Sequence, residues 1–582
     1  MMGPNDKLSE KEIPSSSPSP PVPTAAPPQA NGSSSDESPG TTTPAAAALF
    51  KPGWRFWLIY VSLALITFAA SVDNTIVFTA LPAITREINA GSQYVWIANS
   101  YVIASTAIQP LFGQLSNILG RRVPSLVVVA LFAIGSGIAG GANGVPMLIA
   151  GRTIQGIGCG GIFVLLDVVV CDLVPLRERG KYLGPILAAG GLGSTLGPLI
   201  GGALTAVTWR WVFYITLPFS GLSLITMALF MNMRHVRSKS WKQNLARIDV
   251  PGNALLIASI TAVLLGLLMG GTTFPWSSWR VILPLVLGFV GWATFHAYQL
   301  SSWCKEPTIP PRLFSNRTSA VGFTLSFLSG VLLEWVVYFL PLYFQALKGA
   351  SPLESAVDTL PFNIFLIPTA AIGGILMTKT GTYRPLHGAA YIFLAIGLGL
   401  SSLLNASSSK AEWVIFQIII ALGLGCTFVT LLPAIQASLS ESDVATATAM
   451  YSFLRSFGFI WGITIPSLIL NALVSGRLGT VDDAGVRAQL ANGGAYEFAA
   501  HGSIQALPPA VQQQVVRLYT HAFRTTWLAA LAFALLGFLL VFLEKHVELR
   551  SELDTEFGME SQPKEGIQGK NAEGVRDASV TV

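Results

Sequence analysis

The sequence predicts an all-α membrane protein with fourteen transmembrane helices, built as two six-helix repeats with an extra pair between them (6+2+6). Three observations support this fold class. The chain of 582 residues is 52% hydrophobic and 11% charged, whereas soluble domains carry about 25% charged residues. Long apolar runs recur along the chain, and glycine motifs of its first half return in its second half. A chain this apolar must use lipid as its solvent.

Fourteen apolar runs have about the 20 residues that a helix needs to cross the bilayer. We expect spans at residues 55–80, 94–116, 124–142, 146–171, 182–206, 211–231, 251–271, 280–300, 319–345, 356–378, 385–405, 411–435, 447–473 and 522–543. Lys and Arg concentrate in the short loops that face the cytosol if the N-terminus lies inside. This bias predicts an even number of spans and places both termini in the cytosol.

Composition predicts the domain organisation. The first 50 residues are rich in Ser, Pro, Ala and Thr and almost free of large apolar side chains, which predicts disorder. No cleaved signal peptide is expected. We expect a disordered cytosolic tail over 1–50, a six-helix bundle over 51–235, a linker with two extra helices over 236–317, a second six-helix bundle over 318–545 with a long outer loop at about 474–521, and a disordered cytosolic tail over 546–582.

Three short patterns occur twice, in the same order and at a near-constant separation. The paired patterns begin at Gly113 and Gly374, at Gly156 and Gly423, and at Gly193 and Gly458. One such pairing can arise by chance, but three in order indicate a duplicated six-helix unit. Parallel repeats with a site at their interface near the membrane midplane are typical of transporters. The competing interpretation is an oligomeric membrane scaffold that transports nothing.

Several function classes have no support in the sequence. No phosphate-binding Walker loop or nucleophile elbow is present, so neither ATP-driven transport nor enzyme activity is indicated. The four cysteines lie far apart, and the net charge of +5 is small and spread through loops, which argues against a metal site and against nucleic-acid binding. We expect no cofactor beyond the proton gradient, and we expect a monomer whose partners are the lipid bilayer and a small-molecule substrate.

Four motifs carry the functional interpretation: DNTIVFTALP (73–82), GQLSNILGRR (113–122), RTIQGIGCGG (152–161) and GSTLGPLIGG (193–202). In the second motif two glycines permit a tight cytosolic turn and two arginines anchor it on the inner side. In the fourth motif Gly193, Gly197 and Gly201 fall four residues apart, which makes a smooth stripe for close backbone packing. Pro198 adds a kink beside the stripe, and the kink is tolerable where neighbours satisfy the freed carbonyl.

Together these motifs resemble the major facilitator superfamily, and within it the 14-span drug:proton antiporters of the fungal efflux-pump type, over about residues 55–545. The matching residues are Asp73, Thr75, Ala80, Leu81 and Pro82 in span one, Gly113, Leu115, Gly120, Arg121 and Arg122 in the loop motif, Arg152, Gln155, Gly156 and Gly158 in span four, and Gly193, Gly197, Pro198, Gly201 and Gly202 in span five. The family usually has Asp where this chain has Asn117. Asn117 can still hydrogen-bond a guanidinium, but it carries no charge.

Ionisable side chains inside a span are costly and usually face a cavity or a partner. Asp73 has either a proton or substrate role or a capping or interface role. The resemblance implies that Arg152 takes part in proton coupling by tuning a nearby carboxylate, and the alternative is a purely structural contact with backbone carbonyls. Asp167, about 22 Å further along the same helix by its rise, cannot pair with Arg152 and is either a proton site or an interface hydrogen bonder. Glu334 is a substrate or proton residue, whereas Arg455 is predicted to be structural.

Polar and aromatic side chains in the spans are candidates for a substrate cavity, which would suit an amphipathic organic compound. For any single aromatic residue, lipid contact or helix packing is the simpler interpretation. The candidates are Asn99, Tyr101, Gln109, Gln155, Tyr338, Phe339, Tyr343, Gln345 and Gln436. Asn405 lies in an Asn-Ala-Ser sequence near an outer loop, so glycosylation there is conceivable.

The sequence thus predicts a proton-coupled exporter of small amphipathic compounds (a drug, toxin or secondary metabolite) that works by alternating access in a fungal plasma membrane. The glycine motif of span five favours export, as the resemblance implies. The alternatives are a proton symporter that imports a siderophore or nutrient, and a membrane sensor that transports nothing. The vacuolar membrane is the alternative location.

Overall fold

The computed structural model describes residues 52–88, 90, 93–233, 241–271, 273–491, 494–500 and 503–550. Every extended regular element within these ranges is a helix, and they contain no β-strand. The predicted tail over 1–50 and most of the predicted tail over 546–582 lie outside the described residues.

The first six expected spans are formed by α1 (Trp54–Glu87), α2 (Tyr94–Ala107) with α3 (Gln109–Leu119), α4 (Arg122–Gly140), α5 (Val145–Leu173), α6 (Arg179–Thr205), and α7 (Trp211–Tyr214) with α8 (Thr216–Phe230). The second span is broken at Ile108, and Pro110 lies in the first turn of α3, where its missing N–H is tolerated. Gly120 ends α3 with φ of 78°, a conformation that favours glycine.

The linker forms α9 (Trp241–Ala246), α10 (Val250–Met269) and α11 (Trp279–Gln299). Side-chain caps fix where the two long helices begin. Asp249 accepts a hydrogen bond from the backbone N–H of Gly252 at the start of α10, and Ser278 accepts one from Arg280 at the start of α11. Such caps satisfy backbone donors that have no partner within the helix.

The second half is formed by α12 (Arg317–Tyr343), which continues into a π-helical turn over Phe344–Lys348, then α13 (Pro352–Asp358), α14 (Leu360–Thr380), α15 (Arg384–Ser401), α16 (Lys410–Ala437), α17 (Val444–Ser475), α18 (Ala484–Leu490), α19 (Ala495–Ala500) and α20 (Pro509–Val541). Gly381 ends α14 with φ of 67°. It occupies the place in the second repeat that Gly120 occupies in the first, so both copies of the loop motif turn on a glycine with positive φ.

Twelve helices in the described residues are long and apolar enough to cross a membrane. Two expected spans are not among them. Residues 94–116 are divided between α2 and α3, of 14 and 11 residues, and residues 385–405 form α15, of 18 residues, whose first turn carries the polar residues Arg384 and His387. The all-helical architecture is therefore established, whereas the count of fourteen spans and the cytosolic termini stay predictions.

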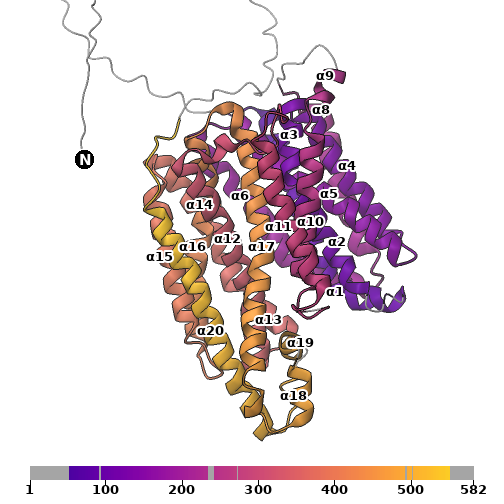
Figure 1. The fold of residues 1–582 in the computed structure, drawn as a ribbon, viewed down its shortest axis with the longest axis vertical. Coiled ribbons are helices and arrows are strands. Elements are labelled where there is room, and N and C mark those ends of the chain that lie inside the picture. Colours follow the sequence, from indigo (N-terminus) through magenta and orange to yellow (C-terminus); the bar gives the residue numbers. More distant parts are fainter. Residues whose placement is uncertain are drawn as a thin grey trace, which may run out of the picture. The chain divides into compact units, whose positions relative to one another are not determined.

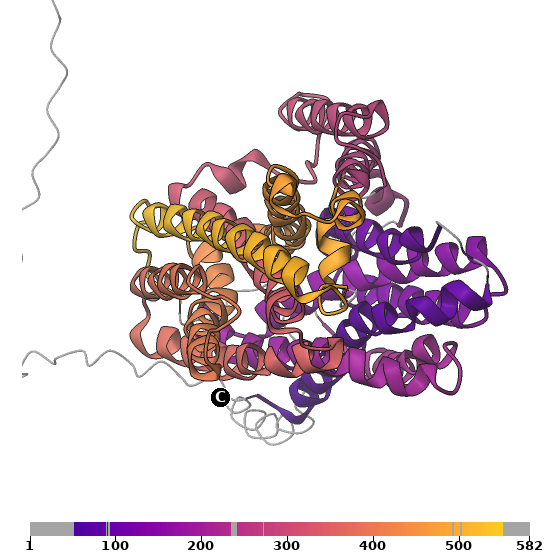
Figure 2. The same ribbon diagram turned by 90° about the horizontal axis from the view of Figure 1, so that it is seen from below.

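The duplicated unit is visible in the helix packing. Helices α1 and α6 pack together in the first half as α12 and α17 do in the second, and α4 packs on α5 as α15 does on α16. Helix α10 contacts α2 of the first half and α17 of the second. Figure 2 shows the indigo-to-purple spans of the first half gathered on one side and the orange-to-yellow spans of the second half on the other.

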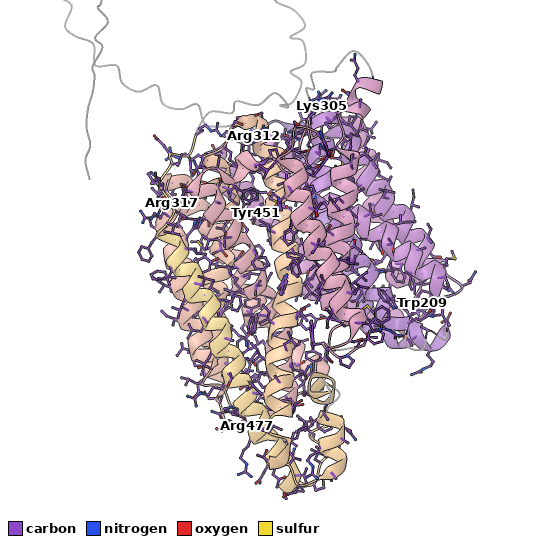
Figure 3. The ribbon with its side chains drawn as sticks, in the orientation of Figure 1. Trp209, Lys305, Arg312, Arg317, Tyr451 and Arg477 are labelled. Atoms are coloured by element: carbon purple, nitrogen blue, oxygen red, sulfur yellow. The ribbon has the colours of Figure 1, made fainter. Side chains whose placement is uncertain are left out.

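We call the face at the top of Figure 1, where α20 ends, the near face, and we call the face at the bottom of that figure the far face. Figure 3 shows Lys305, Arg312 and Arg317 at the near face, and Trp209 and Arg477 toward the far face. The connection between α5 and α6 also lies at the near face, because the backbone N–H of Arg177 donates to the carbonyl of Arg550.

The structure differs from the predicted boundaries at two places. Helix α17 runs to Ser475 and α20 already begins at Pro509, so the far-face connection is shorter than the predicted 474–521 and includes α18 and α19. Residues 546–550, expected to be disordered, pack against the near face: Leu549 is buried and Arg550 hydrogen-bonds to two carbonyls. A short polar stretch has no periodicity that reveals such contacts.

Candidate functional site

A buried ion pair joins α1 to α5 in the first half. Nη1 of Arg152 lies 2.7 Å from Oδ2 of Asp73, and both side chains are almost fully excluded from solvent. Gln155, one turn after Arg152, closes a ring between them. Its Oε1 accepts from Arg152 at 2.7 Å and its Nε2 donates to Oδ1 of Asp73 at 2.7 Å. Each charge thus has the polar partners that burial requires.

Neighbouring helices hold this ring in place. The hydroxyl of Ser136 on α4 accepts from Nε2 of Gln155 at 2.8 Å and from the hydroxyl of Thr216 on α8 at 3.0 Å. The guanidinium of Arg152 lies over the ring of Tyr101 on α2, 4.0 Å from its centroid, which is cation–π geometry. Five helices therefore fix the Asp73–Arg152 pair.

The structure brings together four predicted residues of this ring and its surroundings: Asp73, Arg152, Gln155 and Tyr101. The predicted carboxylate near Arg152 is Asp73. Tyr101, predicted to line a substrate cavity, is buried beneath the guanidinium. Sequence reasoning missed Ser136 and Thr216, because a lone hydroxyl residue in an apolar span gives no signal that separates it from one bonded to its own helix.

A second polar cluster lies at the seam, by which we mean the contact between helices α1–α8 and helices α12–α20. Asp167 on α5 accepts a hydrogen bond from the hydroxyl of Ser452 on α17 at 3.1 Å, and Nη2 of Arg455 lies 3.9 Å from the same carboxylate. Arg455 also donates to the hydroxyl of Tyr451 (labelled in Figure 3) at 3.3 Å. These contacts tie Asp167 to the opposite half, as its interface interpretation predicted, and they give Arg455 a charged neighbour.

Two predicted cavity residues also bridge the seam. Nε2 of Gln109 donates to the hydroxyl of Ser456 at 3.0 Å. Oε1 of Gln436 accepts from Nη1 of Arg179 at 2.7 Å, and Arg179 also donates to the carbonyl of Cys171 at 2.7 Å. Arg179 and Gln436 are almost fully buried. Both glutamines therefore hold the halves together in this conformation, a role that spacing within one helix could not reveal.

The loop motif GQLSNILGRR is a hub of near-face contacts. Nε of Arg121 lies 2.6 Å from Oδ2 of Asp172, and both side chains are buried. Oδ1 of Asn117 accepts from Arg121 at 3.1 Å, and its Nδ2 donates to the hydroxyl of Thr446 on α17 at 2.9 Å. The neutral amide of Asn117 thus still bridges the seam, and the ion pair of Arg121 is formed with Asp172 instead. Arg122 instead holds the end of α8, donating to the Asn232 side chain at 2.7 Å.

Replacing Asn117 with alanine should lower transport, because it removes two hydrogen bonds of about 0.5–1.5 kcal/mol each, one across the seam to Thr446 and one within the loop motif to Arg121. Replacing it with aspartate should preserve transport, since a carboxylate can accept from both Arg121 and the Thr446 hydroxyl. We expect a fall of about three- to tenfold for alanine and less than about twofold for aspartate. Initial efflux rates, normalised to surface expression, test this. Equal rates for the alanine variant and the parent would show that the amide is dispensable.

The glycine stripe of GSTLGPLIGG packs α6 against α1. A Cβ atom at Gly193 would come within 2.6 Å of the carbonyl oxygen of Phe68, and one at Gly201 within 2.8 Å of that of Ile76. Gly197 meets the Thr75 side chain and the Val72 carbonyl. This is the predicted close contact within the first half.

The members of this motif do not all pack alike. Gly202 is exposed, and a Cβ there would meet nothing within 4 Å, so it lies outside the packed stripe formed by the other glycines of the motif. Pro198 lies inside α6, as expected. The seam is reached by another part of α6, where a Cβ at Gly180 would come within 3.1 Å of Gly374 on α14.

The same packing corrects one repeat pairing. Gly458 and Gly462 on α17 meet carbonyl oxygens of α12, as the α6 stripe meets those of α1, which agrees with the predicted pairing of Gly193 with Gly458. In span four, however, Gly423 packs against α15 as Gly158, and not Gly156, packs against α4. The equivalence is therefore displaced by two residues from the GIGC and GLGC letter match. Identical letters two residues apart on a glycine-rich helix are ambiguous without the neighbouring backbone.

Glu334 on α12 has no hydrogen bond or ion pair within the described part of the chain. Tyr338, one turn further, lies 6.3 Å ring to ring from Tyr496 of α19, and Phe339 lies 6.2 Å from the same ring. An aromatic group thus stands on the far-face side of this carboxylate. Unlike Asp73 and Asp167, Glu334 forms no ion pair with any arginine among the described residues.

The remaining predicted cavity residues lie toward the far face. The hydroxyl of Tyr343 donates to the carbonyl of Asn405 at 3.0 Å, and Nε2 of Gln345 donates to Ser355 at 2.8 Å. Asn99 is half-buried on α2. The side chain of Asn405 accepts from the backbone N–H of Ser407 at 2.8 Å, and its glycosylation stays a prediction.

A cavity of about 430 Å³ opens at the near face, lined by Arg312, Ser315, Asn316, Ser438, Leu439, Ser440 and Asp443. It contains none of the predicted substrate residues. Arg312 donates to both carboxylate oxygens of Asp443, and these hydrogen bonds raise the pKa of Arg312 above its usual value. Within the described ranges, no group of three or more His, Cys, Asp or Glu side chains could hold a metal ion.

Comparison with known proteins identifies the family. The model of the Major Facilitator Superfamily matches residues 63–463. The chain is 51% identical over 531 residues to the MFS efflux transporter aclA of Aspergillus oryzae, covering 91% of this chain and 96% of that protein. It is 47% identical over 515 residues to the MFS-type efflux pump LUC4 of a Fusarium species, covering 88% and 91%.

Among solved structures, the fold resembles the human organic anion transporter MFSD10, with a TM-score of 0.53, 15% identity, and coverage of 84% of this chain and 100% of that one. It also resembles the proton:xylose symporter XylE, with a TM-score of 0.51, 16% identity and coverage of 77% and 94%. At these identities the likeness shows the fold alone. The chain belongs to the major facilitator superfamily, and is therefore a multi-pass membrane transporter and not an enzyme.

Proposed function

We propose that this transporter exports small amphipathic organic compounds by proton-coupled alternating access, as a fourteen-span protein with both termini in the cytosol. The buried Asp73–Arg152–Gln155 ring carries the coupling part of the proposal. The export part is supported by the relatives that are named efflux transporters and efflux pumps. With the proposed orientation the near face is cytosolic.

The ring offers a way to link a proton to a movement of helices. Asp73 is held on α1 and Arg152 on α5, so adding a proton to Asp73 removes the charge attraction between these helices. Gln155 and the face of Tyr101 still hold Arg152 after that change. The guanidinium then keeps partners while α1 is released, which makes the proton on Asp73 a local switch for the position of α1.

The seam contacts define the conformation of this structure, which is the one from which an exported compound would be released. Bonds from Asp167, Arg179, Asn117 and Gln109 to the second half close the first half against it on the near-face side. In the proposed orientation the cytosolic entrance is therefore shut in this conformation. Alternating access requires these bonds to break when compound enters from the cytosol.

Glu334 supplies a further candidate for proton or substrate binding, because a carboxylate within a span needs a partner and the described residues form no hydrogen bond or ion pair with it. Replacing it with glutamine should lower gradient-driven efflux and leave the protein at least as stable, since an unpaired charge within a membrane span is costly. Efflux and thermal unfolding in detergent test this. The exposed carboxylate Glu87 provides the control Glu87→Gln, which should change neither. Unchanged efflux in Glu334→Gln would exclude a transport role for this carboxylate.

The decisive experiment measures accumulation of labelled amphipathic compounds in cells with and without the protein, before and after an uncoupler collapses the proton gradient. Higher retention on deletion, with the difference abolished by the uncoupler, supports export. Lower uptake on deletion would instead establish the proton symporter that imports a siderophore or nutrient. A difference that survives the uncoupler would overturn proton coupling. Fluorescent tagging distinguishes the proposed plasma membrane from the vacuolar membrane.

A further inference from the structure

The chain after α20 crosses the near face as an extended segment, residues 545–550, which we call the C-terminal strap. Its first part is fixed to the second half. The backbone N–H of Lys545 donates to the hydroxyl of Thr318 at 3.1 Å, and that of Val547 donates to the hydroxyl of Tyr383 at 3.1 Å. Glu544, immediately before the strap, lies 2.9 Å from His387, and both side chains are fully buried.

The tip of the strap reaches the first half. Leu549 is only 3% exposed and packs in a small apolar cluster with Leu176, which precedes α6, and with Met377 and Ala434 of the second half. The carbonyl of Arg550 accepts from the backbone N–H of Arg177 at 3.1 Å. One side chain and one carbonyl of the strap therefore contact the first half, while residues 545 and 547 hold to the second.

The side chain of Arg550 adds an ion pair beside the seam. Its Nη2 lies 3.1 Å from Oε1 of Glu441 and donates to the carbonyl of Leu439 at 3.2 Å. Glu441 is also 3.9 Å from Nη2 of Arg179, the buried arginine that bonds Gln436 across the seam. Arg550 and Arg179 thus share one carboxylate. The strap is connected to the bonds that close the near face.

We infer that the C-terminal strap is a latch that stabilises the conformation in which the near face is shut. Separation of the halves at this face must break the Arg177–Arg550 bond and expose Leu549, because residues 545 and 547 keep the strap on the second half. The strap therefore opposes opening by the free energy of these contacts, and anything that detaches it favours opening. This inference concerns only which face is shut and depends on neither the substrate nor the proton.

A native cysteine provides the readout. Cys171 is fully buried at the seam, and Nε2 of Gln436 lies 3.3 Å from its sulfur. It should react with N-ethylmaleimide only when the near face opens. In a background where Cys159, Cys304 and Cys426 are replaced by alanine, Leu549→Ala/Arg550→Ala should raise its labelling rate about tenfold, because loss of a buried leucine and an ion pair shifts the equilibrium toward opening. Glu548→Ala, at an exposed strap residue, should leave the rate unchanged.

A second background separates opening from unfolding. With Cys159 as the only cysteine, buried within the first half, the double variant should label no faster than the parent. If Cys159 also becomes reactive, the double variant has lost its fold, and the single variant Arg550→Ala, which keeps Leu549, decides the question by the rate at Cys171. Unchanged labelling of Cys171 in a folded variant overturns the latch. Faster labelling together with absent proton-driven export would retain the latch and reject the proposed function.

Discussion

Replacing Arg152 with alanine is expected to reduce gradient-driven efflux to the level of cells that lack the transporter. The change leaves Asp73 buried beside the neutral side chains of Gln155 and Tyr101, without its cationic partner. Removing one member of a buried ion pair costs about 3–5 kcal/mol, because the remaining charge is uncompensated. Asp73 can then avoid the cost only by keeping a proton, so it can no longer alternate between charged and neutral forms. Efflux assays and thermal unfolding in detergent measure the two effects.

A double variant separates coupling from stability. Asp73→Asn/Arg152→Gln removes both charges and leaves side chains that can hydrogen-bond to each other and to Gln155. We expect it to recover most of the lost thermal stability, because no charge is left unpaired, but not the gradient-driven efflux. A control at Arg86, which is exposed in the last turn of α1 and lies outside the motifs, should keep efflux when replaced by alanine. Normal gradient-driven efflux by a well-expressed Arg152→Ala protein would contradict the proposed role of the ring.

Replacing Gly197 with valine is expected to abolish transport without touching any candidate substrate residue. A Cβ at this position would lie 3.0 Å from the Val72 carbonyl oxygen and collide with the Thr75 side chain. Backbone oxygens cannot move aside as a flexible side chain can, so α1 must shift away from α6. Overpacking of this kind costs about 1–3 kcal/mol, occasionally more. Asp73 lies between the two residues that Gly197 contacts, so the shift also displaces it from Arg152.

The same motif provides a matched control. Gly202→Val adds the identical side chain five positions further along α6, at an exposed site where a Cβ meets nothing within 4 Å. It should leave transport within about twofold of the parent, because surface substitutions rarely change stability by more than about 0.5 kcal/mol. Vesicle-based efflux and surface expression of the two variants should therefore differ sharply. Equal loss in both would show that the motif tolerates no bulk anywhere, independently of α1 packing.

Much of the fold was predictable because apolar length and glycine spacing are local properties of the sequence. The expected spans correspond to helices, and the Gly197 and Gly462 contacts confirm that α6 and α17 occupy equivalent places in the two halves. The division of one span at Ile108 was not foreseen, since the apolar run continues through it. A break inside an apolar run leaves hydropathy unchanged.

The contacts between residues of the candidate site were predictable only in part. Asp73 and Arg152 stood out because ionisable groups are rare in spans, but their pairing depends on how α1 and α5 pack. The Arg121–Asp172 and Arg179–Gln436 contacts were missed altogether. Each contact joins residues on different helices, so spacing along one helix does not indicate it. Asp172 and Arg179 also lie at helix ends, where charged residues are common.

The inserted hairpin of α10 and α11 has a consequence for how the molecule divides into moving bodies. Oε1 of Gln114, in the loop motif of the first half, accepts from Nδ2 of Asn253 at 2.8 Å, and Nε2 of Gln114 donates to the carbonyl of Glu306 at 3.0 Å. These hydrogen bonds attach the hairpin to the first half, and on the second half it packs against α17. Spin labels on α11 and α4 should keep a constant separation through the transport cycle, while labels on α11 and α20 should change theirs. On this expectation, α10 and α11 move together with the first half, and the relative motion takes place between the hairpin and the second half.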